Sequence, residues 1–258
     1  MAGILLVIGG LWAAAVYLNR RRWRRLNRTG KRDEGIVVFV EPVRWLFVVW
    51  GFAWFCRGLR QAGGRQYVHL FRWSSIAGAL LVVPDLVNRR RLDRLAARLA
   101  KHLLRLRRRH PHVPIHVVGY STGAYVASEA CKRIPPLNGR LVLLAPSASP
   151  AYDWSGLADH GVAVHSFHSP FDLINVLGPA LFGSNDRRWG PAAGAVGFRQ
   201  APPSVAQRPW RLSDAALGYL GDHFTVAAPA FVARHVAPPA VLTTVAAAVV
   251  FASRSASL

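Results

Sequence analysis

The sequence predicts an α/β fold, because short apolar runs alternate with longer segments of helical periodicity. One observation is the run Ile115–Val118, which is rich in β-branched residues and leads directly into a glycine-bounded turn. The other is the segment 88–109, where leucines recur at helical spacing among arginines. Strands and helices in alternation are typical of a mostly parallel sheet with helices on its faces.

Further strands are expected wherever a short run of apolar, β-branched or aromatic residues is bounded by turn residues. These runs are Ile36–Val40, Trp45–Trp50, Tyr67–Trp73, Arg140–Ala145 and Val162–Phe167. Each is short enough to be one strand, and their spacing leaves room for a helix or loop between neighbours. The sequence therefore predicts one sheet built along most of the chain.

The helices are identified by periodicity and by the residues that end them. Within 88–109 the apolar face expected to be buried consists of Leu92, Leu95, Leu99, Leu103 and Leu106. A second helix is expected at Ala124–Arg133, where Pro135-Pro136 ends it. Shorter helices are expected at Ser213–Leu220 and Phe224–Val236.

Residues 178–210 are rich in Gly and Pro and carry Trp189, Phe198 and Trp210. Such a composition is typical of irregular structure. Two interpretations stay open, namely an apolar flap over a functional site and a long connecting loop.

The length of 258 residues suits one domain with a short anchor. We expect an anchor with a basic segment at 1–34, a domain at 35–238 and an apolar tail at 239–258. The apolar run of the tail, Ala240–Ala252, is too short for a membrane span. The two cysteines, Cys56 and Cys131, have no disulfide or zinc pattern and are expected to be buried free thiols.

The formal net charge of +21 is concentrated in two blocks. Residues 20–34 carry eight basic and two acidic side chains, and residues 88–109 carry ten basic and one acidic. Local basic blocks suit an anionic surface such as lipid headgroups or nucleic acid. A nucleic-acid-binding protein is therefore an alternative, but the sequence contains no recognised module of that kind, and we expect no nucleic-acid partner.

The amino terminus is expected to be a membrane anchor. Ala2–Leu18 contains no charged residue, and Asn19-Arg20-Arg21-Arg22-Trp23-Arg24-Arg25 follows it. A helix of this length spans about 26 Å, just short of a bilayer core of about 30 Å. No basic residue precedes the run, as one would in a secretory signal. We expect a single-pass anchor with the basic segment 20–32 and the domain on the cytoplasmic side. A cleaved or buried helix is the alternative.

A motif with catalytic chemistry lies at Gly119-Tyr120-Ser121-Thr122-Gly123. It stands between an apolar strand and a helix, which is the context of a nucleophile elbow. A sharp turn there lifts the Ser121 hydroxyl above the sheet, and Gly119 and Gly123 omit side chains that would meet neighbouring backbone. The amino terminus of the next helix favours a developing oxyanion. A plain strand–turn–helix with a capping serine is the alternative.

On this motif and its context, the chain from about Ile36 to Val236 resembles the α/β-hydrolase superfamily, in particular its small lipase- and esterase-like members. The resemblance implies a central, mostly parallel sheet flanked by helices. It also implies the chain order nucleophile, acid, histidine. Both partners of Ser121 are then expected later in the sequence.

The resemblance implies that Asp172 is the acid, in the turn after the strand Val162–Phe167. Asp186 and Asp153 remain alternatives. It implies that His223, in a loop ahead of the last helix, is the base, and His235 is the alternative at the far end of that helix.

The oxyanion hole implied by the resemblance takes one donor from the N–H of Thr122. The second is expected from Phe52 in Trp50-Gly51-Phe52-Ala53, where a tryptophan replaces the usual histidine. Neither a metal nor a cofactor is expected, because no Gly-rich phosphate loop or metal-ligand spacing occurs.

The function implied is hydrolysis of a carboxylic ester, either a lipid or another acyl ester. In this mechanism His223 takes the proton of Ser121, Asp172 orients the imidazole, and water releases the acyl-enzyme. A catalytically silent α/β-hydrolase fold, serving as a binding or scaffold protein at the membrane, is the alternative.

Overall fold

A six-stranded parallel sheet forms the centre of the part of the chain that the structure describes. The structure is a computed structural model and describes residues 2–157 and 162–237. The strand order is β2-β1-β3-β4-β5-β6, and all neighbouring strands are parallel. The strands are β1 (Lys31–Val40), β2 (Gln66–Phe71), β3 (Ile115–Tyr120), β4 (Leu141–Leu144), β5 (Val164–His168) and β6 (Val205–Pro209). The predicted α/β fold is confirmed.

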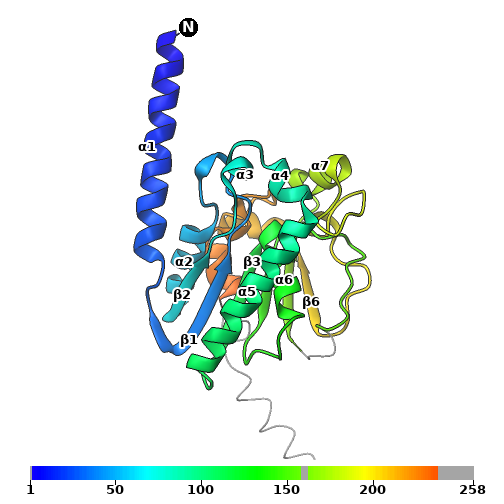
Figure 1. Cartoon of the computed structure of the whole chain (residues 1–258). Helices are drawn as coiled ribbons and strands as arrows, with labels where there is room; N and C mark the ends of the chain where they lie inside the picture. The colour runs from blue at the N-terminus through cyan, green and yellow to red at the C-terminus, as the bar shows by residue number, and fades with distance from the viewer. Residues whose placement is uncertain (1, 158–161, 238–258) are drawn as a thin grey trace, which may run out of the picture.

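Helices and helical turns cover both faces of this sheet (Figure 1). Those before the elbow are α1 (Ala2–Leu26), η1 (Trp45–Phe47), α2 (Phe52–Gln61), α3 (Ile76–Leu81), α4 (Val83–Val87) and α5 (Arg89–Arg109). Those after it are α6 (Thr122–Cys131), α7 (Leu173–Phe182), α8 (Ala193–Val196), η2 (Leu212–Leu217), η3 (Thr225–Ala227), α9 (Pro229–Phe231) and η4 (Val232–Val236). The predicted tail 239–258 lies outside the described residues.

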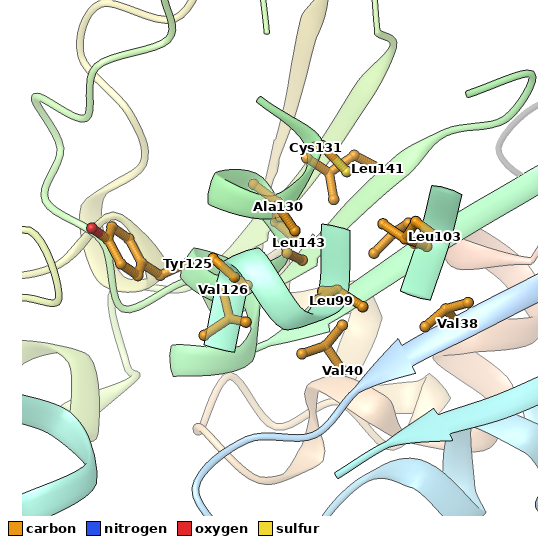
Figure 2. Close-up of a cluster of buried hydrophobic side chains, with 14 of the residues drawn as sticks. Val38, Val40, Leu99, Leu103, Tyr125, Val126, Ala130, Cys131, Leu141 and Leu143 are labelled. Atoms are coloured by element: carbon orange, nitrogen blue, oxygen red, sulfur yellow. The ribbon is translucent and has the colours of Figure 1, made fainter. Parts of the chain in front are cut away.

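On one face, α5 and α6 pack against the central strands (Figure 2). The side chain of Asn88 accepts a hydrogen bond from the Arg91 amide at 3.0 Å, which satisfies an amide of the first turn of α5. Leu92, Leu99 and Leu103 are completely buried, as their spacing predicts. Complete burial of one leucine contributes about 1.5–3 kcal/mol, so this face of α5 is what fixes it to the sheet.

On the other face, aromatic side chains fill the space between the sheet and α2. Phe39 of β1 contacts Phe52 and Phe55 of α2, with ring centroids 5.5 and 5.2 Å apart. The two cysteines are buried free thiols, one on each face, as predicted. The sheet is therefore covered on both sides, and its strand ends stay available for a site.

Helix α1 has a docked part and a free part. Trp23 is buried against α2 and the sheet, and Asn19 exchanges two hydrogen bonds with the backbone of Val49 at 3.0 and 3.2 Å. Most side chains between residues 4 and 18 are exposed. Within residues 2–157 and 162–237, no helix has both the length and the hydropathy needed to cross a membrane. The predicted transmembrane span at Ala2–Leu18 is therefore unsupported.

The prediction of a strand at Trp45–Trp50 is wrong. The chain makes one 3₁₀ turn there, with Leu46 and Phe47 at φ of +50° and +65°. Left-handed backbone is incompatible with an extended strand. The apolar residues of this segment cross the carboxyl edge of the sheet, where Trp45 and Trp50 line a cavity.

The segment 178–210 is more regular than a long loop. It contains the end of α7, the short helix α8 and the edge strand β6. Only Val205 of β6 is buried, so the strand shows no apolar run in the sequence. The expected helix Ser213–Leu220 is the 3₁₀ helix η2. The expected helix Phe224–Val236 is helical over most of its length, as η3 followed by α9, which runs directly into the π-helix η4.

Candidate active site

Ser121 occupies a strained turn between β3 and α6. Its φ and ψ are +57° and −128°, a backbone conformation that L-residues other than glycine rarely adopt. A Cβ at Gly119 would lie 2.7 Å from the Gly123 carbonyl oxygen, and a Cβ at Gly123 would collide with the carbonyl oxygen of Glu41. Only glycines at both positions allow the turn to pack this closely, as expected for a nucleophile elbow.

The structure brings Ser121, His223 and Asp172 together in one hydrogen-bonded chain. The Oγ atom of Ser121 lies 3.0 Å from Nε2 of His223. On the other side of the ring, Nδ1 lies 2.8 and 3.0 Å from the two carboxylate oxygens of Asp172. All three side chains are buried. This geometry favours the imidazole tautomer that donates from Nδ1 to the carboxylate and accepts at Nε2.

Asp172 is held in place by the start of α7. The residue follows β5 and caps α7, since its carboxylate accepts a hydrogen bond from the amide of Asn175 at 3.0 Å. The side-chain Nδ2 of Asn175 donates to the same carboxylate at 2.8 Å. The acid is 1% exposed, so these bonds are only weakly screened by solvent.

The loop that carries His223 is fixed by Tyr120, the residue before the nucleophile. The Tyr120 hydroxyl donates a hydrogen bond to the backbone carbonyl of His223. Burial raises the pKa of this hydroxyl well above its usual range, so it remains a neutral donor. Tyr120 thus positions the loop that carries His223, while the next residue, Ser121, lies within hydrogen-bond distance of the imidazole ring.

Ser147 and Asn175 complete a polar network that sequence reasoning missed. Ser147 Oγ lies 3.2 Å from Ser121 Oγ, and its hydroxyl donates to Asn175 Oδ1 at 2.8 Å. Asn175 in turn contacts Asp172, so the network closes a ring around the site. Ser147 comes shortly after β4, the strand next to β3. Its position shortly after a predicted strand, and so at the carboxyl edge of the sheet, is the signal from which the sequence could have indicated Ser147 as a site residue.

The alternative acids and base lie in other networks. Asp186 accepts hydrogen bonds from Ser149 and Ser184 and organises the turn after α7. Asp153 is exposed and bonds to the neighbouring Ser155. His235 lies beside a buried ion pair, 3.5 Å from Asp214. Their contacts are structural, which leaves Asp172 and His223 beside Ser121.

Of the two predicted oxyanion donors, only Thr122 is well placed. It begins α6, so its N–H is one of the first-turn amides that have no acceptor within the helix. The N–H of Phe52, by contrast, donates to the Trp50 carbonyl at 2.9 Å, and its side chain is completely buried. The expectation for Phe52 therefore does not fit, because the strand from which it was argued is absent.

A cavity of about 200 Å³ opens beside the Ser121 hydroxyl. Its lining is mainly apolar and comes from the loop after β1, the segment of α3 to α4, and α7. The apolar side chains include Val43, Trp45, Trp50, Val82, Leu86 and Ile174, and the polar ones include Ser147, Asn175 and Asn185. Its volume lies below the range of about 300–1,000 Å³ typical of drug-sized ligands, so it suits an apolar group of modest size.

The fold and site define the class of protein. A parallel sheet, a strained nucleophile elbow and the chain order Ser121, Asp172, His223 are those of an α/β-hydrolase fold.

Comparisons with known proteins find similarity in structure alone. No family model and no curated protein matches the sequence. Similar solved structures include an α/β serine hydrolase homologue from Coxiella burnetii, at 12% identity and TM-score 0.46, covering 82% of this chain and 87% of that one. A lipase-esterase related protein from Clostridium acetobutylicum has 12% identity and TM-score 0.46, with coverage of 81% and 96%. A Trichoderma reesei cutinase with a phosphonate inhibitor has 14% identity and TM-score 0.38, with 88% of both chains covered. Likenesses of this strength carry no conclusion about activity.

Proposed function

We propose that the protein is a serine hydrolase that cleaves a carboxylic ester through an acyl-enzyme on Ser121. The observation that supports this most strongly is the continuous chain of hydrogen bonds from Ser121 through His223 to Asp172. Nucleophile and base are within hydrogen-bond reach, and the base is oriented by a third group. An apolar cavity beside the hydroxyl leaves room for the acyl group.

The residues divide the reaction into two half-reactions. His223 Nε2 takes the proton as Ser121 Oγ forms a bond to the carbonyl carbon, and it then gives that proton to the departing alcohol. The carboxylate of Asp172 stabilises the imidazolium between these events. Water next attacks the acyl-enzyme with the same proton transfers in reverse order, which releases the acid and restores Ser121.

We assign the oxyanion hole to the amides of Thr122 and Val43. In the loop that follows β1, the amides of Glu41, Arg44 and Trp45 already donate to other groups, and Pro42 has none. Val43 remains, and it lines the cavity beside Ser121. This loop also runs against Gly123, which supports its close approach to the nucleophile.

We also propose that residues 2–18 and the basic segment 20–32 attach the protein to a membrane. The exposed apolar side chains of α1 and the arginines that follow them support this partner. Location of the domain on the cytoplasmic side remains a prediction from the arginines alone. The division of the chain at residues 34 and 238 likewise remains a prediction.

Hydrolysis of p-nitrophenyl esters of increasing acyl length tests the proposed function. Each methylene that enters the apolar cavity contributes about 0.8 kcal/mol, so kcat/KM should rise about fourfold per methylene until the cavity is filled. Ser121→Ala should abolish turnover, and Ser147→Ala, which removes a neighbouring hydroxyl, should retain it. A folded wild-type protein that hydrolyses no ester of the series would favour a silent binding protein instead.

A further inference from the structure

A set of exposed apolar side chains surrounds the mouth of the cavity. They lie on η1, α3 and α7, which meet at the carboxyl edge of the sheet. We call this set the apolar rim, and it consists of Trp45, Phe47, Ile76, Leu80, Leu81, Leu173, Leu177 and Leu181. Ile76, Leu81 and Leu181 are 70, 69 and 66% exposed. Exposed apolar side chains gathered at one end of a molecule mark an interaction site more often than scattered single residues do.

The rim is continuous with the wall of the cavity. Trp45 belongs to both, since it is 41% exposed and also lines the cavity. Val82 follows Leu81 directly and lines the cavity, and Ile174 of α7 does the same beside Leu173. Whatever covers the rim therefore lies directly over the entrance to Ser121.

Helix α1 projects from the same end of the molecule. Its hydrogen bonds from Asn19 to Val49 fix that residue next to the loop after η1. The amino-terminal part of α1 extends past α3 and α7, as Figure 1 shows. Among its exposed apolar side chains, Ile4, Ile8, Leu11 and Trp12 lie along one face of the helix, and Leu6 lies on the opposite face. An exposed apolar helix face followed by a run of arginines suits the interface of an anionic bilayer.

The charges near the rim match an anionic surface. Residues 43–51, 76–84 and 173–182 contain no acidic side chain. Arg20, Arg21, Arg24 and Arg25 gather on one side of α1, where the docked part begins. Arg72 has Arg44 and Arg20 near it, together with the buried carboxyl of Glu41. Clusters of arginine beside an apolar segment attract anionic lipid headgroups.

The apolar rim and the free part of α1 lie at the same end of the molecule, the rim is continuous with the cavity wall, and the charge nearby is basic. We therefore propose that the apolar rim docks on an anionic lipid bilayer, so that the cavity opens onto the lipid and takes its ester from there. This rests on the proposed ester hydrolysis and adds the source of the substrate. A lipid ester would then pass from the bilayer into the cavity without crossing bulk water, where exposure of its apolar acyl chain is unfavourable.

Environment-sensitive labels on the full chain test this docking. Leu80→Cys and Leu177→Cys place a thiol on two elements of the rim, and His112→Cys places one in an exposed turn at the opposite end of the sheet. Burial raises the pKa of the native thiols, Cys56 and Cys131, to about 12, so a maleimide fluorophore will react with the introduced cysteine. Vesicles of phosphatidylcholine, with and without phosphatidylglycerol, serve as the probe.

We expect the labels at 80 and 177 to shift to shorter emission wavelengths on vesicles containing phosphatidylglycerol, while the label at 112 stays unchanged. The double variant Leu80→Asp/Leu177→Asp should bind these vesicles at least about tenfold more weakly than wild type. Bound protein with unchanged rim labels would show that α1 alone anchors it, and would overturn the proposal. A shift that instead appears without vesicles as protein concentration rises would assign the rim to a second copy and also overturn it.

Hydrolysis of p-nitrophenyl butyrate without vesicles separates the two proposals. It depends on Ser121 and the cavity but not on lipid. If this ester is not hydrolysed while the rim labels respond to vesicles, the proposed function fails and the docking surface stands. If it is hydrolysed while the labels do not respond, the docking surface fails and the proposed function stands.

Discussion

Asn175 connects more of the site than any residue predicted from the sequence. Its side chain donates to the Asp172 carboxylate at 2.8 Å and to the Ala145 carbonyl at 3.0 Å. Its oxygen accepts a hydrogen bond from the hydroxyl of Ser147, which lies beside the nucleophile. The residue lines the cavity but makes no hydrogen bond to the reacting hydroxyl, so we regard it as a positioning residue for the acid.

Asn175→Ala is expected to lower kcat about tenfold to a hundredfold with little change in KM. A hydrogen bond to a charged group contributes about 1.5–3 kcal/mol, and this one orients the acid rather than binding substrate. Steady-state ester hydrolysis measures both constants. Asn185→Ala is the matched control, because Asn185 is also buried and lines the cavity but has no side-chain bond to the triad. Equal losses in the two variants would contradict the role of Asn175.

At this scale the sequence predicts the residues that stand in a motif and misses those that stand only in a network. Ser121, Asp172 and His223 are marked by a turn between strand and helix and by chain order. Ser147 and Asn175 come together only because β4 and α7 are neighbours in space, 28 residues apart in the chain. No local pattern encodes such a contact. The prediction of Phe52 as an oxyanion donor does not fit, because the segment before it is a turn and not a strand.

At the scale of elements, the elbow depends on how closely β1, β3 and α6 approach. The first turn of α6 lies against the end of β1, where a Cβ at Gly123 would collide with the carbonyls of Val40 and Glu41. Backbone atoms cannot move aside without shifting the strand. The geometry of the nucleophile is thus set by three elements together.

Gly123→Ala is expected to destabilise the protein by about 2–4 kcal/mol and to abolish activity, because overpacking against backbone is costly. Urea unfolding measures the free energy. Gly178→Ala is the control: it lies in α7 with nothing within 4 Å of an added Cβ, and should stabilise by about 0.5–1 kcal/mol. A Gly123→Ala protein as stable as wild type would contradict the proposed packing.

His116 in β3 should make stability depend on pH. It is completely buried, and burial together with the nearby Arg140 lowers its pKa to about 4. Between about pH 6.5 and 4 the unfolded chain binds a proton there and the folded chain does not, so stability falls as the pH falls. The loss from this residue should reach about 2 kcal/mol at pH 5 relative to pH 7.

Unfolding of His116→Asn in urea at pH 7 and pH 5 measures that contribution. Asparagine offers an acceptor to the Arg140 amide, which the ring now does at 3.3 Å, and it does not titrate. The variant should lose less stability than wild type between the two pH values. An unchanged difference would contradict the lowered pKa of His116.

The elements that the sequence predicts correctly are those buried on a regular face. Helix α5 shows its leucines at helical spacing, and β3 is buried along its whole length. The elements it misses have no such face. Edge strand β6 buries one residue, and in Trp45–Trp50 the two tryptophans line the cavity while Val49 packs in the core. Hydrophobicity alone does not distinguish these two environments.

At the scale of the whole molecule, basic charge lies at two ends with different expected roles. The arginines of α1 lie where its docked part begins, near the rim. Those that end α5 lie at the opposite end of the sheet, since the chain turns from there into the start of β3. The proposed membrane contact involves only the first group.

Reversing three charges on α1, in Arg20→Glu/Arg21→Glu/Arg25→Glu, should weaken binding to anionic vesicles at least about a hundredfold. Each arginine near an anionic surface contributes about 1 kcal/mol. Vesicle flotation measures the affinity. Arg107→Glu/Arg108→Glu/Arg109→Glu changes the net charge equally at the far end and should have little effect. Equal weakening in both variants would indicate non-specific attraction by net charge instead.

The central claim is that Ser121 is the nucleophile, and covalent labelling by a fluorophosphonate tests it most directly. Two buried hydroxyls lie 3.2 Å apart in the cavity, Ser121 and Ser147, but only Ser121 is bonded to His223. Peptide mass mapping should therefore place the adduct on Ser121. Labelling should vanish in Ser121→Ala and His223→Ala and persist in Ser147→Ala. An adduct on Ser147, or labelling retained in Ser121→Ala, would contradict the claim.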